Sequence, residues 1–192
     1  SEYFDSYHKK GGWKALTVIS MAIGQGELGT TPIQMANMTA AIANRGYYYT
    51  PHIVKSIGAD KRIDPKFTEK HVISIDSANF EEIILGMEAV VNGGPGGTAR
   101  SVAMSDIIIC GKTGTAENPF GEDHSVFVAF APKDDPQIAI AVYVENAGFG
   151  STYAAPVASL MIEKYLKSVI ADNRKWFEQR MLDLILYLRL DI

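Results

Sequence analysis

The sequence has 192 residues, of which 47% are hydrophobic and 21% charged, so it is long and apolar enough to form a globular domain with a buried core. The formal net charge of −4 and the scattered basic residues provide no surface suited to nucleic acid, so no nucleic-acid partner is expected. No apolar run approaches the roughly 20 residues that span a bilayer. Any membrane anchor is therefore expected to lie outside this chain.

The first clear element is a helix that begins near Pro32. Thr31 is a suitable N-cap, proline suits the first helical position, and Gly46 is expected to end the helix. Between these limits apolar or small side chains occur all around the helix, at Ile33, Met35, Ala36, Met38, Ala40, Ala41, Ile42 and Ala43. We therefore expect this helix to be buried on most sides.

A second helix is predicted, with polar capping residues at 76–79. Its apolar positions recur at helical spacing, at Ile83, Ile84, Met87, Val90 and Val91. The segment 92–97 reads NGGPGG and should end the helix. We also expect its glycines to permit a close approach to the strand that follows.

Three strands are predicted next, at 107–115, 125–131 and 137–145. The turn at 132–136 is too short for a crossover, so the last two strands should form an antiparallel hairpin. The loop 117–124 should join the first two strands in the same way. The predicted fold class is α/β of the α+β type, an antiparallel sheet flanked by helices, with the strand 107–115 at one side.

Two helices are predicted after the sheet. Residues 154–170, with Pro156 in the first turn, should cover it. From Asn173 onward a further helix places apolar side chains on one face, at Phe177, Met181, Leu184, Ile185 and Leu188. Packing within the protein is favoured over a partner-binding role for this face. We divide the chain into a domain portion, 1–170, and a C-terminal helical extension, 171–192.

The single cysteine, Cys110, excludes an internal disulfide. It could be a reactive thiol, but it follows the Ile-rich segment 107–109. A buried, inert thiol is therefore the favoured interpretation.

The residues with the clearest chemical potential are Lys112, Thr113, Gly114 and Thr115. Alternation puts the first two side chains on opposite faces of a strand, so a ligand that uses both should meet the strand at its edge. Gly114 would let a peptide backbone approach closely. Lys112 offers a cation, Thr113 a hydroxyl, and the Thr115 amide can point at a developing oxyanion. These are parts of an acyl-transfer site, and the alternative is an ordinary surface strand.

Several segments in order resemble the transpeptidase domain of class B penicillin-binding proteins, with the elongation-type penicillin-binding protein 2 subgroup as the nearest match. They are IGQGELGTTPIQMANMTAAIANRG at 23–46, GKTGTAE at 111–117, SVFVAFAP at 125–132 and IAIAVYVEN at 138–146. The resemblance runs from about Trp13 to Leu166. It implies a transpeptidase fold of the penicillin-binding and β-lactamase type that is incomplete in this chain.

The family implies three motifs around one cleft, and the Lys-Thr-Gly strand is the third of them. A literal S-x-x-K occurs at Ser6–Lys9 and a literal S-x-N at Ser77–Asn79, but both lie in the wrong place and have the wrong flanking residues. Ser77–Asn79 has a simpler role as a helix cap. We expect both to be chance matches and the nucleophile to lie upstream, so that this chain is a C-terminal fragment that is inactive alone.

The implied activity of the parent protein is a serine D,D-transpeptidase that cross-links peptidoglycan stem peptides through an acyl-enzyme. Lys112 and Thr115 would be catalytic, and Thr113 and Gly114 would bind substrate. Expected partners are the D-Ala-D-Ala end of the stem peptide, β-lactams, the missing N-terminal part of the same protein and membrane proteins of the elongation machinery. No cofactor is expected. The implied location is the bacterial inner membrane, with the catalytic domain in the periplasm.

Two other functional classes stay open, a β-lactam sensor domain and a β-lactamase. The family sheet has five strands, and its first strand pairs with the one at 137–145 here, so that edge would be bare. We therefore expect dimerisation, or association with the absent part, through this edge.

Two further motifs are weaker. Gly111-Lys112-Thr113 imitates the end of a phosphate-binding P-loop, but Asp106 stands where that motif requires glycine. The residues GEDH at 121–124 are expected to form a solvated hairpin loop rather than a metal site.

Overall fold

The computed structural model describes residues 6, 14–26, 28–60 and 62–187. The chain divides into two compact units, 1–31 and 32–192. The first unit contains helix α2 (Ala15–Ala22), which the sequence patterns did not predict. Gly24 and Gly26 follow it with φ angles of 82° and 97°. The GQG segment is therefore a turn that uses the left-handed freedom of glycine.

Helix α3 (Pro32–Ala43) opens the second unit and begins where Thr31 and Pro32 predicted. Gly46, at φ 111°, donates its N–H to the Ala41 carbonyl at 2.9 Å and ends the helix. The prediction that α3 is buried on most sides is wrong. Its buried residues are Thr39, Ala41 and Ala43, whereas Ile33 is 59% and Met38 54% exposed. The helix packs against β1 (Tyr47–Tyr48), α4 (Ser77–Asn92), β4 (His124–Ala131) and β5 (Ile138–Val144), and the rest of its surface is half-buried or exposed.

A small two-stranded antiparallel sheet follows, formed by β1 (Tyr47–Tyr48) and β2 (His71–Val72). Neither strand was predicted. Short 3-10 turns elsewhere in the unit cover Pro65–Phe67, Gly94–Gly96, Arg100–Val102 and Asp172–Arg174.

Helix α4 (Ser77–Asn92) confirms the second predicted helix, with its cap among the polar residues 76–79. Its N-cap is Asp76, whose carboxylate accepts the Ala78 N–H at 2.9 Å, so Ser77 belongs to the helix instead of capping it. The NGGPGG segment ends the helix, but its glycines approach α4 itself and not the next strand. A Cβ at Gly97 would lie 2.7 Å from the Val90 carbonyl oxygen.

The main sheet consists of β3 (Cys110–Ala116), β4 (His124–Ala131) and β5 (Ile138–Val144). The strands are antiparallel in the order β3-β4-β5, which confirms the predicted meander and places β3 at one side. The strand β3 begins at Cys110 and not at Ile107. The Ile109 carbonyl accepts the Asn92 side-chain amide at the end of α4, and the Ile108 carbonyl accepts the Lys133 N–H beyond the end of β4.

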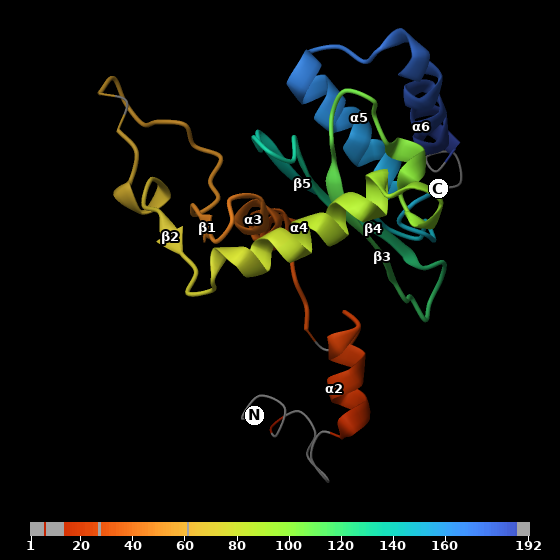
Figure 1. Ribbon diagram of the computed structural model, residues 1–192, viewed down its shortest axis with the longest axis horizontal. Helices are drawn as coiled ribbons and strands as arrows, with labels where there is room; N and C mark the ends of the chain where they lie inside the picture. Colours follow the sequence, from red (N-terminus) through yellow and green to blue (C-terminus); the bar gives the residue numbers. More distant parts are fainter. Residues whose placement is uncertain (1–5, 7–13, 27, 61, 188–192) are drawn as a thin grey trace. The chain divides into compact units, whose positions relative to one another are not determined.

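Helices cover both faces of this sheet (Figure 1). On one face α3 and α4 enclose Ala43, Ile84, Met87, Cys110 and Phe130. On the other face α5 (Ala154–Lys167) packs against β4 and β5 in a larger core that includes Ile109, Phe127, Ile140, Val142 and Ile162. This arrangement confirms the predicted mixed fold of helices and an antiparallel sheet.

Helix α6 (Lys175–Tyr187) follows α5 and packs against it. Phe177 and Met181 are buried in the larger core, which confirms that this face packs within the protein. The side chains of Leu184 and Ile185, and Leu188 as a whole, lie outside the described residues. The division at residue 170 stays a prediction.

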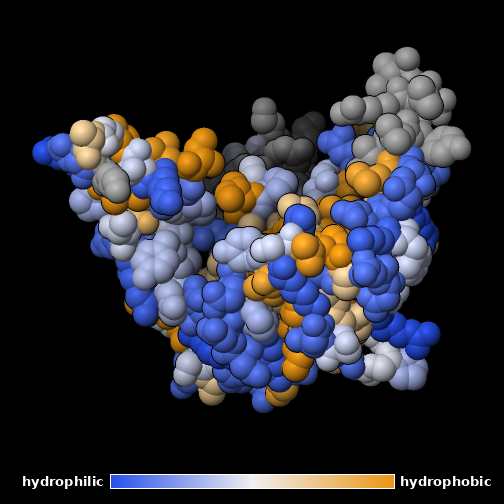
Figure 2. Space-filling view, turned by 90° about the horizontal axis from the view of Figure 1, so that it is seen from above, coloured by the Kyte–Doolittle hydropathy of each residue, from blue (hydrophilic) through white to orange (hydrophobic). Residues whose placement is uncertain are grey.

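None of the helices in the described part of the chain has the length and apolar content that a membrane span requires. On the face shown in Figure 2, hydrophobic residues form separate patches between hydrophilic ones.

Candidate active site on strand β3

Strand β3 carries all four residues that the sequence indicated, and alternation sorts them by face. Lys112 and Gly114 follow Cys110 on the side of α3 and α4, where Cys110 contacts the apolar cluster. Thr113 and Thr115 lie on the opposite side with Gly111, where a Cβ on Gly111 would overlap the Phe127 ring. Among the described residues β3 pairs with β4 alone, so its other side is an edge. That a ligand would use side chains of both faces from this edge stays a prediction.

Lys112 lies at an apolar groove of about 430 Å³ between α3 and α4. The groove is lined by Met38 and Ile42 of α3, by Ile83, Met87 and Val90 of α4, and by Val128 of β4. Lys112 is the charged member of this lining, and its side chain is exposed. Its ammonium donates a hydrogen bond to the Thr113 carbonyl at 2.7 Å. A cation beside apolar walls attracts a carboxylate more strongly than the same cation in open water.

Thr113 is partly buried, and its hydroxyl is 2.9 Å from the hydroxyl of Thr98. Thr98 comes from the segment after NGGPGG and was not a candidate in the sequence. Two residues further along β3, Thr115 pairs in register with Ser125. The Ser125 hydroxyl donates to the Phe149 carbonyl at 2.9 Å and accepts the Ala154 N–H at 3.1 Å. This end of the β3–β4 pair is therefore tied to the start of α5.

Gly114 lies in close contact with β4, since a Cβ there would be 3.3 Å from the Val126 Cβ. The segment before α5 also approaches it. A Cβ on Gly150 would lie 2.5 Å from the Gly114 carbonyl oxygen and would overlap the Val126 carbonyl. Two glycines thus allow backbone-to-backbone packing here, and only Gly114 had been noted from the sequence.

Neither of the two literal serine motifs belongs to β3 or to the lining of its groove, and residues 7–9 of the first motif lie outside the described residues. Ser77 lies in the first turn of α4, about 9 Å along the helix axis before Ile83, the first groove residue on this helix. Ser6 belongs to the separate unit 1–31. We therefore keep the interpretation of both serine motifs as chance matches.

The loop that carries GEDH is held by hydrogen bonds to the segment that follows β5. The Asp123 carbonyl accepts the N–H groups of Ala147 and Gly148 at 2.9 and 2.7 Å, and the His124 ring accepts the Asn146 N–H at 3.1 Å. In the described ranges no cluster of three or more His, Cys, Asp or Glu side chains is placed to hold a metal ion.

Cys110 is fully buried, as the sequence indicated. Burial, with a smaller effect from the Glu88 carboxylate, raises the pKa of its thiol to about 12. The thiolate, which is the reactive form, is therefore disfavoured, and Cys110 has no role in the chemistry of β3.

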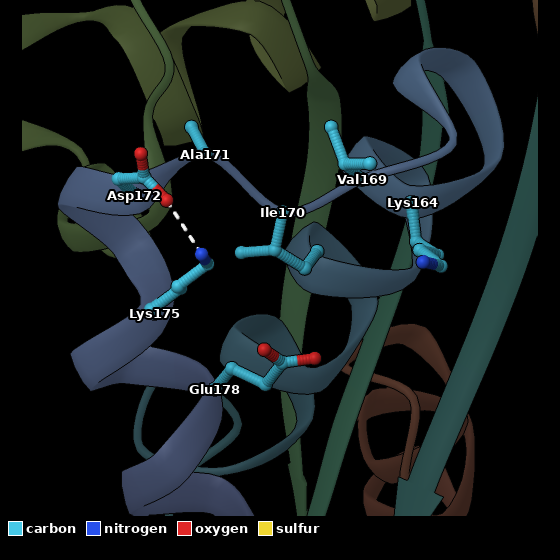
Figure 3. A pocket seen from close by; sticks show the side chains of 7 residues that line it. All are labelled: Lys164, Val169, Ile170, Ala171, Asp172, Lys175 and Glu178. Atoms are coloured by element: carbon cyan, nitrogen blue, oxygen red, sulfur yellow. Dashed lines mark ion pairs between the residues drawn. The ribbon is translucent and has the colours of Figure 1, made fainter.

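The charged residues of α5 and α6 lie on the other side of the sheet. A cavity of about 450 Å³ is lined by residues of both helices and of the connection between them (Figure 3). Its Asp172 and Lys175 pair with each other at 2.5 Å. Nearby, the fully buried Glu163 pairs with Arg174 at 2.8 Å. These four charges form two ion pairs, one exposed and one buried, on the side of the sheet away from Lys112, so we assign them no part in acyl transfer.

Comparison with known proteins identifies the family. The model of the penicillin-binding protein transpeptidase domain matches residues 3–163. A curated relative from Haemophilus influenzae, peptidoglycan D,D-transpeptidase MrdA, is 33% identical over 186 residues. The match covers 85% of this chain but 28% of the relative, so the chain spans less than a third of that protein.

Solved structures agree with this match. Pseudomonas aeruginosa PBP2 in complex with WCK 5153 is 40% identical, with a TM-score of 0.76 over 87% of this chain and 37% of that one. The imipenem acyl-enzyme complex of penicillin-binding protein A from M. tuberculosis is 29% identical, with a TM-score of 0.64 over 77% and 33%. Helicobacter pylori PBP2 in complex with MreC is 27% identical, with a TM-score of 0.69 over 87% and 30%.

The matched range includes the strand with the Lys-Thr-Gly residues, the groove helices and most of α5. From these similarities and from the sheet with its two helical layers, the chain belongs to the penicillin-binding protein transpeptidase domain family.

Proposed function

We propose that the protein containing this chain is a peptidoglycan D,D-transpeptidase. A serine would attack the carbonyl between the two D-alanines of a stem peptide, and the terminal D-alanine would leave. The amine of a second stem would then take the acyl group and release the serine. The observation that carries the proposal is the position of Lys112-Thr113-Gly114-Thr115 on β3, an outer strand that pairs with β4 alone in the described part of the sheet, in a chain of this family.

Each residue of the strand has a role in this proposal. Lys112, at the mouth of the groove, would supply the fixed cation that favours the deprotonated nucleophile. The Thr113 hydroxyl would hold the substrate carboxylate, and the Thr115 amide would donate to the oxyanion. Gly114 would let the substrate backbone lie along the edge. The nucleophilic serine is assigned to a segment outside residues 1–192, so the isolated chain would not form an acyl-enzyme.

The serine of the complete protein would also be acylated by β-lactams. The acyl-enzyme complex of the M. tuberculosis relative with imipenem supports this part of the proposal. A β-lactam sensor and a β-lactamase are the alternatives. A sensor would hold the acyl group without transferring it to an amine, and a β-lactamase would release it within seconds.

We also propose the location and partners of the complete protein. The Helicobacter pylori relative forms a complex with MreC, and a partner protein of that kind is proposed here. The catalytic domain would lie in the periplasm at the inner membrane, where peptidoglycan is assembled. A further contact would form through the outer edge of β5, which has no paired strand among the described residues.

A fluorescent penicillin tests the activity. The complete gene product that contains these 192 residues should give a covalent band that persists on denaturing gels. Lys112→Ala should reduce the rate of labelling at least a hundredfold, because the cation that activates the nucleophile is lost. Lys55→Ala removes an exposed lysine outside β3 and the groove, and it should label like the wild type.

Two outcomes would contradict the proposal. One is an unlabelled complete gene product. The other is labelling of the isolated chain that disappears in Ser6→Ala, because the nucleophile would then lie within the chain. Transfer of the acyl group to a D-amino acid acceptor separates a transpeptidase from the sensor and the β-lactamase.

A further inference from the structure

Thr98 and Thr113 lie 15 residues apart in sequence, and their hydroxyl oxygens are 2.9 Å apart. We propose that Thr98 is a positioning residue, which holds the Thr113 hydroxyl in the orientation that binds the carboxylate of the substrate or inhibitor. The inference rests on the proposed function, in which Thr113 meets that carboxylate.

The segment that carries Thr98 is fixed at both ends. The Gly97 N–H donates to the Gly94 carbonyl at 3.1 Å, and the Ala99 N–H donates to the Val90 carbonyl at 2.9 Å. Gly97 packs so closely on α4 that a Cβ would lie 2.7 Å from the Val90 oxygen. Ala99 is fully buried in the larger core. Thr98 therefore stands on rigid backbone although its own side chain is exposed.

The end of α4 is also tied to β3 directly. The Asn92 side-chain amide donates to the Ile109 carbonyl at 2.8 Å, one residue before the strand begins. This bond fixes the distance between the Thr98 segment and the strand. The two hydroxyl groups therefore meet between two segments of backbone that are each anchored.

The chemistry of hydroxyl groups gives the pair a direction when a ligand is bound. Thr113 has one O–H hydrogen, and it must point at the carboxylate to donate to it. Its oxygen can then only accept from Thr98, so Thr98 becomes the donor of the pair. A hydrogen bond received by a hydroxyl polarises its own O–H and makes it a better donor. Thr98 would thus both fix the rotamer of Thr113 and strengthen its bond to the carboxylate.

Acylation of the complete gene product by two penicillins tests the inference, one with a free carboxylate and one as its methyl ester. The wild type should prefer the free acid. In Thr98→Val the second-order acylation rate for the free acid should fall about threefold to tenfold, while the rate for the ester changes little. Thr98→Ser should keep the wild-type preference. Thr68→Val, the same loss of a hydroxyl in the turn after Pro65–Phe67, is the matched control and should leave both rates unchanged.

A second comparison asks whether Thr98 acts through Thr113. Thr113→Val should lose the preference for the free acid, and adding Thr98→Val to it should cost nothing further. If Thr98→Val slowed both penicillins equally, or cost as much in the Thr113→Val background as alone, Thr98 would be a structural residue only and the inference would be overturned.

The contact also has a readout apart from activity. With labelled threonine methyl groups, three-bond couplings report the rotamer of Thr113 in solution. A single rotamer in the wild type that becomes averaged in Thr98→Val supports the inference, and unchanged couplings overturn it. A wild type that no penicillin acylates would contradict the proposed function, and the couplings would still decide the role of Thr98.

Discussion

At the scale of single residues, Cys110 and Lys112 show how two residues on one face of β3 come to differ in burial. They lie two positions apart, so their side chains point the same way. Cys110 is fully buried in the cluster that it shares with Ile84 and Met87 of α4, whereas Lys112 lies at the apolar groove and is exposed. Alternation predicts the shared face from the sequence, but the depth of burial depends on a helix that begins 33 residues earlier.

Cys110 should therefore be unreactive in the folded chain. Treatment with a thiol reagent at about pH 8 should modify it only as fast as the protein unfolds, and modification should be complete in urea. Rapid modification without urea would contradict the burial.

The raised pKa of the Cys110 thiol also determines how the stability of the fold changes with pH. The neutral thiol is favoured by the fold, so its contribution to stability is present below the ordinary pKa of 9.0 and is lost as the pH rises toward about 12.

Gly111 provides a second prediction at this scale. Gly111→Ala should lower the free energy of unfolding by about 1–3 kcal/mol, because the added Cβ overlaps the buried ring of Phe127. Urea unfolding followed by circular dichroism measures the change.

Gly86 is the matched control, since it lies in α4 and an added Cβ would meet nothing within 4 Å. Gly86→Ala should raise the free energy of unfolding by up to about 1 kcal/mol, because alanine favours helix over glycine. Equal effects in the two variants would contradict the packing described for Gly111.

At the scale of elements, helix ends were the most predictable feature. Thr31-Pro32 and Asp76 mark the starts of α3 and α4 with local signals that do not depend on the rest of the fold. Strands β1 and β2 have two residues each, which is too short to show a periodic pattern, so the sequence could not reveal them. The burial of α3 was misjudged because an apolar helix surface shows what a helix can cover, but not which neighbours cover it in this chain.

The connection between α5 and α6 depends on one buried acid. Glu163 accepts the Ala171 N–H at 3.2 Å and pairs with Arg174, which also donates to the Ser159 hydroxyl at 2.9 Å. Arg174→Met should lower the free energy of unfolding by about 3–5 kcal/mol, because it leaves the Glu163 charge without its main partner. Chemical denaturation of the chain measures this loss.

Two comparison variants isolate the cause. Lys175→Met removes the exposed pair with Asp172 and should change stability little. Adding Glu163→Gln to Arg174→Met should recover part of the loss, since no buried charge remains. If the double variant were as unstable as the sum of the single ones, the loss would come from packing and not from charge.

At the scale of the whole molecule, the sequence indicated the candidate residues of β3 but not the residues that surround them. Lys112, Thr113, Gly114 and Thr115 form a contiguous motif, and one strand brings them together. Thr98 and Gly150 reach the same strand from separate loops. Their contribution depends on how α4 and α5 pack on the two faces of the sheet, and a local pattern carries no information about that.

The outer edge of β5 leads to the last prediction, that the 192-residue chain self-associates. A strand edge without a partner presents free backbone groups, and the β5 segment IAIAVYV has no charge to oppose pairing with a second copy. Light scattering after size exclusion should show a mass that rises with concentration. Tyr143→Lys introduces a charge on β5 and should shift the chain toward monomer, whereas Tyr165→Lys changes an exposed residue of α5 and should have no effect. If the chain stayed monomeric at every concentration, or if both variants reduced association equally, β5 would not be the contact. Association through β5 would mean that its outer edge can accept a further strand. That strand could come from a second copy of the chain or from another part of the complete protein.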